Sequence, residues 1–177
     1  WTFTLRDGVT FHTGRALDST AVKESIQRTI DLGQSASYIW GAVESIDTPD
    51  PQTVVFNLSY PSPLDLVASG TYAAYVYDVQ AAGDADLTTW FNEGHDAGSG
   101  PYTVGEWKKG EELELRLVAY DAYWGGWDGH PYTTYEFRVV PEVTTAQQLL
   151  ESGQVDAVQR LNPQLWAAFQ GRDGFQT

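Results

Sequence analysis

The sequence predicts a mixed α/β fold of the α+β kind, because segments with strand periodicity interleave with segments of helical periodicity. Near the start, Phe3 and Leu5 alternate with polar residues, which is typical of a half-buried strand. Further along, Val22, Ile26 and Ile30 recur at helical spacing. Hydrophobic residues make up 42% of the 177 residues and aromatic residues 14%. That composition is sufficient for a packed core.

The first elements follow from turn and capping residues. A strand at 2–6 ends at an Asp-Gly turn, and we expect it to form a hairpin with residues 9–12. A helix is predicted over 19–33, where Gly33 ends the apolar spacing. The candidate residues for its N-terminal cap are Asp18, Ser19 and Thr20.

The remaining elements are bounded by Gly, Pro, Asn and Asp. The segment 71–80 is aromatic and fits neither a helix nor a strand clearly. In chain order, the other predicted elements are an antiparallel hairpin at 43–60, short helices at 62–70 and 84–94, a hairpin at 101–120, a strand at 133–140, a helix at 143–153, a strand at 154–159 and a helix at 162–169.

Charge and composition exclude several classes of partner. The formal net charge of −14 repels phosphate backbones and anionic lipids, so we expect no nucleic-acid partner. No stretch approaches the roughly 20 apolar residues that span a bilayer, and no membrane span is expected.

The chain has no cysteine and no methionine, and it begins within a strand pattern. We expect it to be a piece of a longer protein.

Catalytic and metal-binding signatures are weak. The three histidines, His12, His95 and His130, are far apart in the sequence and lack metal-ligand spacing, so no metal site and no cofactor is expected. Ser99 stands in "AGSGP", where a proline follows at the position at which a nucleophile elbow would start its helix. Paired acids on so acidic a chain are typical of a solvated surface. We therefore expect no enzyme activity.

Four segments in collinear order carry a resemblance to a known family. They are "WTFTLRDGVTFHTGRALDSTAVKESIQRTI", "VESIDTPDPQTVVFNLSYPSPLDLVASG", "GSGPYTVGEWKKGEELELRLVAYDAYWGG" and "YEFRVVPEVTTAQQLLESGQVD". In this order they resemble the extracytoplasmic solute-binding proteins of family 5, which serve ABC importers of peptides, nickel and related solutes. The departures, such as Ala119, Asp121 and Ser99 at positions where the family usually has other residues, remove no catalytic group.

The resemblance implies a partial periplasmic-binding-protein-like fold. Residues 1–97 would form the extra subdomain of the first lobe and residues 98–177 part of that lobe, while the opposite lobe would be absent. The implied function is capture of an oligopeptide or similar small solute and its delivery to an ABC transporter permease. The implied protein is a monomer outside the cytoplasm, either periplasmic or a cell-surface lipoprotein.

The resemblance also implies residues that contact the solute. They would lie after the first long helix, after the short helix at 62–70, and at the end of the strand predicted at 154–159. The candidates are Tyr38, Trp40, Ser69, Tyr72, Gln159 and Arg160. The carboxyl ends of strands in α/β sheets are also the usual place for binding groups.

The segment "YWGGWDGHPY" at 123–132 has two interpretations. Its rings could stack on a ligand, or they could pack against the sheet while the glycines allow tight turns. The second interpretation is favoured. Two other functions remain open, namely a secreted carbohydrate-binding module or glycan-active enzyme, and an interaction domain without a small ligand.

Overall fold

The computed structural model describes residues 1–129, 132–159 and 161–176. The chain divides into two compact units, and each is described by itself. The first comprises Trp1–Trp107 and Arg116–Tyr135, and the second comprises Lys108–Leu115 and Glu136–Thr177. The subdomain boundary expected at residue 97 stays a prediction.

The long helix of the first unit lies where the sequence predicts it. Helix α1 spans Ser19–Leu32, and the Asp18 carboxylate accepts a hydrogen bond from the Ala21 amide at 2.8 Å. This bond satisfies one of the free amides at the helix start. At the other end, Gly33 has φ 61° and donates its amide to the Ile30 carbonyl. Both ends of α1 are therefore set by local residues.

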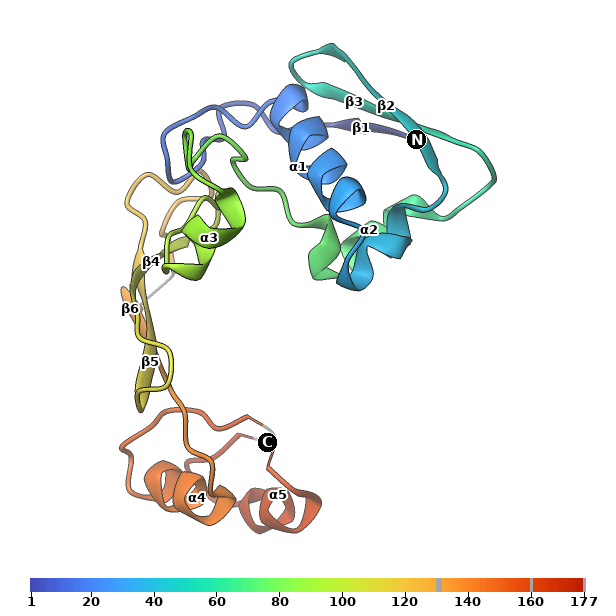
Figure 1. Cartoon of the computed structure of the whole chain (residues 1–177). Coiled ribbons are helices and arrows are strands. Elements are labelled where there is room, and N and C mark those ends of the chain that lie inside the picture. The colour runs from blue at the N-terminus through green and yellow to red at the C-terminus, as the bar shows by residue number, and fades with distance from the viewer. Residues whose placement is uncertain (130–131, 160, 177) are drawn as a thin grey trace. The chain divides into compact units, whose positions relative to one another are not determined.

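A three-stranded antiparallel sheet covers one side of α1 (Figure 1). Strands β1 (Thr2–Thr4), β2 (Val43–Asp50) and β3 (Thr53–Leu58) lie in the order β1-β3-β2. The hairpin predicted at 43–60 is confirmed as β2 and β3.

The hairpin predicted between the first strand and residues 9–12 is wrong. Strand β1 pairs with β3, with Phe3 opposite Val54. Residues 9–16 instead turn back on themselves, because the Phe11 amide donates to the Arg15 carbonyl and Gly14 adopts φ 86°. Phe11 is fully buried, and its burial stabilises this turn together with the backbone hydrogen bond.

The core of the first unit lies between α1 and the sheet. Residues from three short helices also belong to the core. They are η1 (Ser35–Trp40), which follows α1, and α2 (Leu64–Ser69) and η2 (Tyr72–Ala74), which follow the sheet. The buried cluster consists of Val22, Ile26, Ile39, Trp40, Ile46, Val54, Phe56, Leu64 and Ala73. Burial of this apolar surface is the main stabilising contribution to the unit.

The short helices predicted at 62–70 and 84–94 are confirmed. They correspond to α2 and to α3 (Leu87–Asn92), which Asp86 caps through the Thr89 amide. Residues 71–80, which fit neither a helix nor a strand pattern in the sequence, form η2 and then an irregular stretch to residue 80.

A second three-stranded sheet has the order β4-β5-β6. Its strands are β4 (Tyr102–Trp107), β5 (Leu113–Ala119) and β6 (Thr134–Arg138), as the sequence predicts. At the turn between β4 and β5, Gly110 has φ 86° and the Lys108 amide donates to the Glu114 carbonyl.

The second unit contains α4 (Val143–Glu151) and α5 (Pro163–Phe169), which correspond to the helices predicted at 143–153 and 162–169. The strand predicted at 154–159 is wrong. The amides of Gln154 and Val155 donate to the Leu149 carbonyl, so the chain folds over the end of α4 and does not extend. In the described part of the chain, no helix combines the length and the apolar character needed to cross a membrane.

Candidate functional site

The candidate site is built on η1, α2 and η2, which lie together in the first unit. Trp40 holds η1 in place. Its indole stacks on Phe56 with ring centroids 5.6 Å apart, and its Nε1 donates to the Ala73 carbonyl at 2.9 Å. That bond ties the end of η1 to η2. Trp40 is only 4% exposed and belongs to the core, so we do not include it among the solute contacts.

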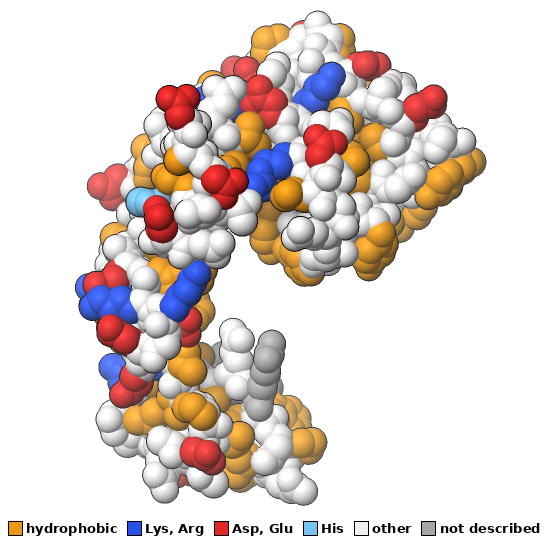
Figure 2. Space-filling model, viewed as in Figure 1, with side chains coloured by type: hydrophobic (Ala, Val, Ile, Leu, Met, Phe, Trp, Pro, Cys, Tyr) orange, Lys and Arg blue, Asp and Glu red, His pale blue; other side chains and the backbone are white. Residues whose placement is uncertain are grey.

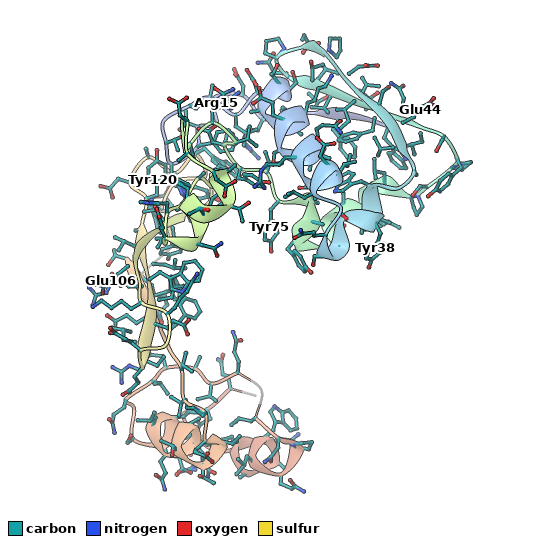
Figure 3. All side chains as sticks on the ribbon, in the orientation of Figure 1. Arg15, Tyr38, Glu44, Tyr75, Glu106 and Tyr120 are labelled. Atoms are coloured by element: carbon teal, nitrogen blue, oxygen red, sulfur yellow. The ribbon has the colours of Figure 1, made fainter. Side chains whose placement is uncertain are left out.

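Tyrosine rings project from the same elements towards solvent. In η1, Ile39 and Trp40 are buried while Tyr38 is 79% exposed. Tyr72 and Tyr75, on and just after η2, are 59% and 70% exposed. Figure 3 shows Tyr38 and Tyr75 at the same edge of the first unit, close to the C-terminal end of α1. We call the three rings of Tyr38, Tyr72 and Tyr75 the tyrosine surface.

Hydrogen bonds fix part of the tyrosine surface. The Tyr72 hydroxyl lies 2.5 Å from Ser35 Oγ, which links η2 to the start of η1. The Thr71 side chain caps η2 by accepting from the Ala73 amide, and Ser69 Oγ donates to the Leu66 carbonyl at the end of α2. The backbone that carries the rings is therefore held on both sides of Gly70.

An open hollow of about 370 Å³ lies along α2 and η2. It is lined by Ala68, Ser69, Gly70, Thr71, Tyr72, Ala74 and Tyr75, none of which carries a charge. Figure 2 shows hydrophobic side chains gathered along the same edge of the first unit. The hollow can accept an uncharged group, and its polar groups are hydroxyls and backbone atoms.

The structure brings some of the predicted site residues together and separates others. Tyr38, Ser69 and Tyr72 lie on the three adjoining short helices. Gln159 belongs to the second unit, on a bend and not at the end of a strand. Arg160 lies outside the described residues. The sequence interpretation missed Tyr75, although its three-residue spacing from Tyr72 is the repeat of a 3₁₀ turn.

The contacts of the segment at 123–129 favour its structural interpretation. Trp124 Nε1 donates to the Ser99 carbonyl at 3.1 Å, and the Arg6 guanidinium lies 4.6 Å from the centre of the Trp124 ring. The Tyr123 ring packs so close to Gly125 that an added Cβ there would lie 2.5 Å from it. These aromatic residues therefore brace the turn.

A second hollow, of about 530 Å³, lies between α1 and residues 79–80. Near it, Arg15 bonds to Asp78 at 2.9 Å and to Glu24 at 2.8 Å. Burial acts to raise the pKa of Asp78, but hydrogen bonds from Arg15, Thr13 and the Gln80 amide outweigh it and hold the pKa below its ordinary value. These charges are satisfied by one another, which is typical of a structural network.

A partly buried ion pair joins the turn at 9–16 to the segment after α3. His12 Nδ1 lies against Asp96 Oδ2, and its Nε2 lies 2.8 Å from the Gly100 carbonyl. Burial acts to lower the pKa of His12, but the bonds with Asp96 and Gly100 outweigh it and raise the pKa. Among the described residues, no group of three or more His, Asp or Glu side chains is placed to hold a metal ion.

Comparison with known proteins identifies the class to which this fold belongs. Residues 1–177 match the family of bacterial extracellular solute-binding proteins, family 5, in its middle region. The chain belongs to that family.

Two relatives of known sequence show how much of a longer protein this chain matches. The chain is 34% identical over 117 residues to the probable D,D-dipeptide-binding periplasmic protein DdpA of Escherichia coli, a match that covers 65% of this chain and 23% of DdpA. It is 33% identical over 180 residues to Protein XP55 of Streptomyces lividans, with 99% and 31% of the two chains covered. The chain thus spans less than a third of the length of either relative.

Solved structures give the same fold. The nickel ABC transporter structure from Bacillus halodurans superposes with a TM-score of 0.75 at 27% identity, covering 98% of this chain and 34% of that one. The mixed α/β class is confirmed. This chain matches only about a third of the solved chain, which is consistent with a partial periplasmic-binding-protein-like fold.

Proposed function

We propose that this chain is part of an extracytoplasmic solute-binding protein that captures short peptides or similar small solutes and passes them to an ABC permease without changing them. Residues 1–97 form the extra subdomain of its first lobe, and residues 98–177 form part of that lobe. The whole protein works outside the cytoplasm, as a periplasmic protein or a surface lipoprotein, and as a monomer.

The observation that carries the proposal is the uncharged hollow beside the tyrosine surface in a chain of this family. Tyr38, Ser69 and Tyr72 contact the solute from the first unit, and contacts from Gln159 and Arg160 remain a prediction. Capture follows from closure around the solute, in which a ligand that touches both sides stabilises the closed form. Residues 1–177 by themselves bind weakly, because association costs are unchanged while many contacts are missing.

Titration calorimetry of the full-length protein that contains this chain tests the proposal. The probes are di- to pentapeptides, a nickel–histidine complex, and cello- and malto-oligosaccharides. We expect saturable binding of at least one peptide, with the peptide recovered intact as judged by mass spectrometry. Binding of none of the peptides, or turnover of any probe, would overturn the proposal.

The alternative is a carbohydrate-binding module, and the exposed tyrosines are the observation that favours it. Aromatic faces stack on the apolar faces of sugars as well as on peptide side chains. Selective binding of an oligosaccharide in the same titrations would establish this alternative.

A further inference from the structure

The Asp-Gly turn that follows β1 takes no part in the candidate site, and its chemistry is separate. Asp7 and Gly8 are both exposed, and Gly8 has φ 74°, a left-handed conformation that glycine adopts without strain. The Gly8 amide donates to Asp7 Oδ1 at 3.0 Å. Among the described residues, no backbone carbonyl accepts from this amide. The Asp7 carboxyl group therefore lies directly against the nitrogen of the next peptide bond.

That contact is the one needed to close a five-membered ring. The Gly8 nitrogen attacks the side-chain carboxyl carbon of Asp7, a succinimide forms, and the amide proton leaves with the carboxyl hydroxyl as one water molecule. Hydrolysis at either ring carbonyl takes up one water and gives aspartate or isoaspartate, in which the main chain runs through the side-chain carboxyl carbon. Groups held about 3–3.5 Å apart are close to the geometry of attack.

The surroundings of Gly8 leave room for this ring. A Cβ added at Gly8 would meet no atom within 4 Å, so neighbouring side chains do not cover the backbone there. Glycine also lacks the side chain that hinders the attacking nitrogen in other residues. Ring closure at Asp7 therefore requires no displacement of a neighbouring residue.

Two further Asp-Gly pairs, at 128–129 and 173–174, allow an internal comparison. Both pairs are exposed, and both glycines have positive φ. Across residues 1–129, 132–159 and 161–176, no hydrogen bond joins either of these two glycine amides to the carboxylate before it. The three pairs thus share their sequence and exposure, and the pair at 7–8 differs in holding its reacting groups together.

We infer that Asp7 is a site of spontaneous isoaspartate formation in the folded protein, and that it reacts faster than Asp128 and Asp173. The reaction needs only water, and no oxidant, enzyme or solute takes part. The inference is therefore independent of the proposed function.

Isoaspartate at position 7 would lengthen the main chain where it is held on both sides. Before this position, the Leu5 amide donates to the Gln52 carbonyl at 2.7 Å. After it, the Val9 carbonyl accepts from the Leu17 amide at 2.9 Å. The added main-chain carbon must be absorbed between these two bonds, so the reaction changes the path of the chain between β1 and the turn at 9–16.

The test follows the three Asp-Gly pairs in the full-length protein that contains this chain. One sample is kept folded and another unfolded in guanidinium chloride, for several weeks at the same mildly acidic pH and the same temperature. Enzymatic methylation specific for isoaspartate, followed by peptide mapping, gives the amount of product at each site. We expect at least about threefold more product at Asp7 than at either other site in the folded sample, and similar amounts at all three in the unfolded one.

Two substitutions assign the product to the ring closure at Asp7. Asp7→Glu keeps the charge but would need a six-membered ring, so isoaspartate should disappear at this position alone. Asp7→Asn closes the same ring and expels ammonia, which leaves more readily than water. At neutral pH it should give more isoaspartate at position 7 than the unsubstituted protein. Circular dichroism confirms that both variants fold.

The outcomes are distinct. An excess at Asp7 that is present in the folded sample and absent from the unfolded one supports the inference. Equal product at the three sites of the folded protein, or an excess that persists in guanidinium chloride, would show that local sequence alone sets the rate. Absence of product at position 7 in Asp7→Asn would show that the turn does not reach the ring-closing geometry. Each of these last results overturns the inference and leaves the proposed function untouched.

Discussion

His12 and Asp96 form an ion pair with Nδ1 2.5 Å from Oδ2, across 84 positions of the sequence. The His12 side chain is only 5% exposed, and its second ring nitrogen faces the Gly100 carbonyl at 2.8 Å. A carboxylate and a carbonyl both accept, so the imidazole makes both bonds when each nitrogen carries a proton. The pair is therefore a charged tie between the turn at 9–16 and the segment 96–100.

The first prediction concerns alkaline stability. The pKa of His12 is raised in the folded protein, so its contribution is fully present below about pH 6.5 and is lost as the pH rises through the folded value. We expect the free energy of unfolding of the protein to fall between pH 6 and pH 9, and to fall less in His12→Ala. Urea titrations at both pH values measure the difference. An equal slope in the two proteins would contradict the role of His12.

The second prediction concerns the partner carboxylate. Burial acts to raise the pKa of Asp96, but hydrogen bonds from His12, the Gly98 amide and Thr103 outweigh it and lower the pKa from 3.8 to about 2. This shift corresponds to about 2 kcal/mol at pH 7. Asp96→Asn should lower the free energy of unfolding by that order, and the difference should shrink as the pH falls from about 4 through about 2.

A matched control for Asp96→Asn is Asp84→Asn. Asp84 is exposed and lies in the same part of the sequence. Its substitution should change the free energy of unfolding by less than about 0.5 kcal/mol, as is usual for surface sites. Equal effects of the two substitutions would show that net charge, and not the tie to His12, sets the stability.

The third prediction concerns Trp40. Trp40→Phe retains a ring against Phe56 but removes the donor to the Ala73 carbonyl, which is buried with no other described donor to it. Leaving a buried acceptor unpaired costs about 1–3 kcal/mol. Denaturant unfolding should show that loss. We further expect quenching experiments to show greater solvent access to Tyr72, and unchanged access would mean that the bond does not hold η2.

The fourth prediction concerns the glycines of the turn at 123–126. Gly125→Ala would place a methyl group 2.5 Å from the Tyr123 ring, so the ring must move at a cost of about 1–3 kcal/mol. Gly100→Ala is the control, because a Cβ at Gly100 meets nothing within 4 Å. Thermal unfolding should separate the two variants by several degrees. Equal melting temperatures would show that the Tyr123 ring does not brace this turn.

Elements whose ends are set by neighbouring residues could be predicted from the sequence. Helix α1 is one example, since Asp18 and Gly33 are local signals. The two wrong predictions, the hairpin with residues 9–12 and the strand at 154–159, concern segments whose structure depends on a distant strand or on a backbone hydrogen bond. Strand β1 pairs with β3 about 50 residues later, and the segment after α4 is held by the Leu149 carbonyl, neither of which periodicity reveals.

The candidate site could be predicted only in part. Tyr38 and Tyr72 follow from the family resemblance, and the structure places both on the tyrosine surface. The burial of Trp40 could not be read from the sequence, because a 3₁₀ helix of six residues is too short to show an apolar face. Tyr75 was missed because the aromatic segment around it fitted neither regular pattern.

The indole of Trp40 joins η1 to η2 through its bond to the Ala73 carbonyl. Backbone segments that are already ordered lose little conformational entropy when a ligand arrives, so affinity is not reduced by the need to assemble them. Under the proposed function, solute contact with Tyr38 and Tyr72 should then proceed at a rate governed by diffusion and water release, with no slow loop-folding phase in stopped-flow traces.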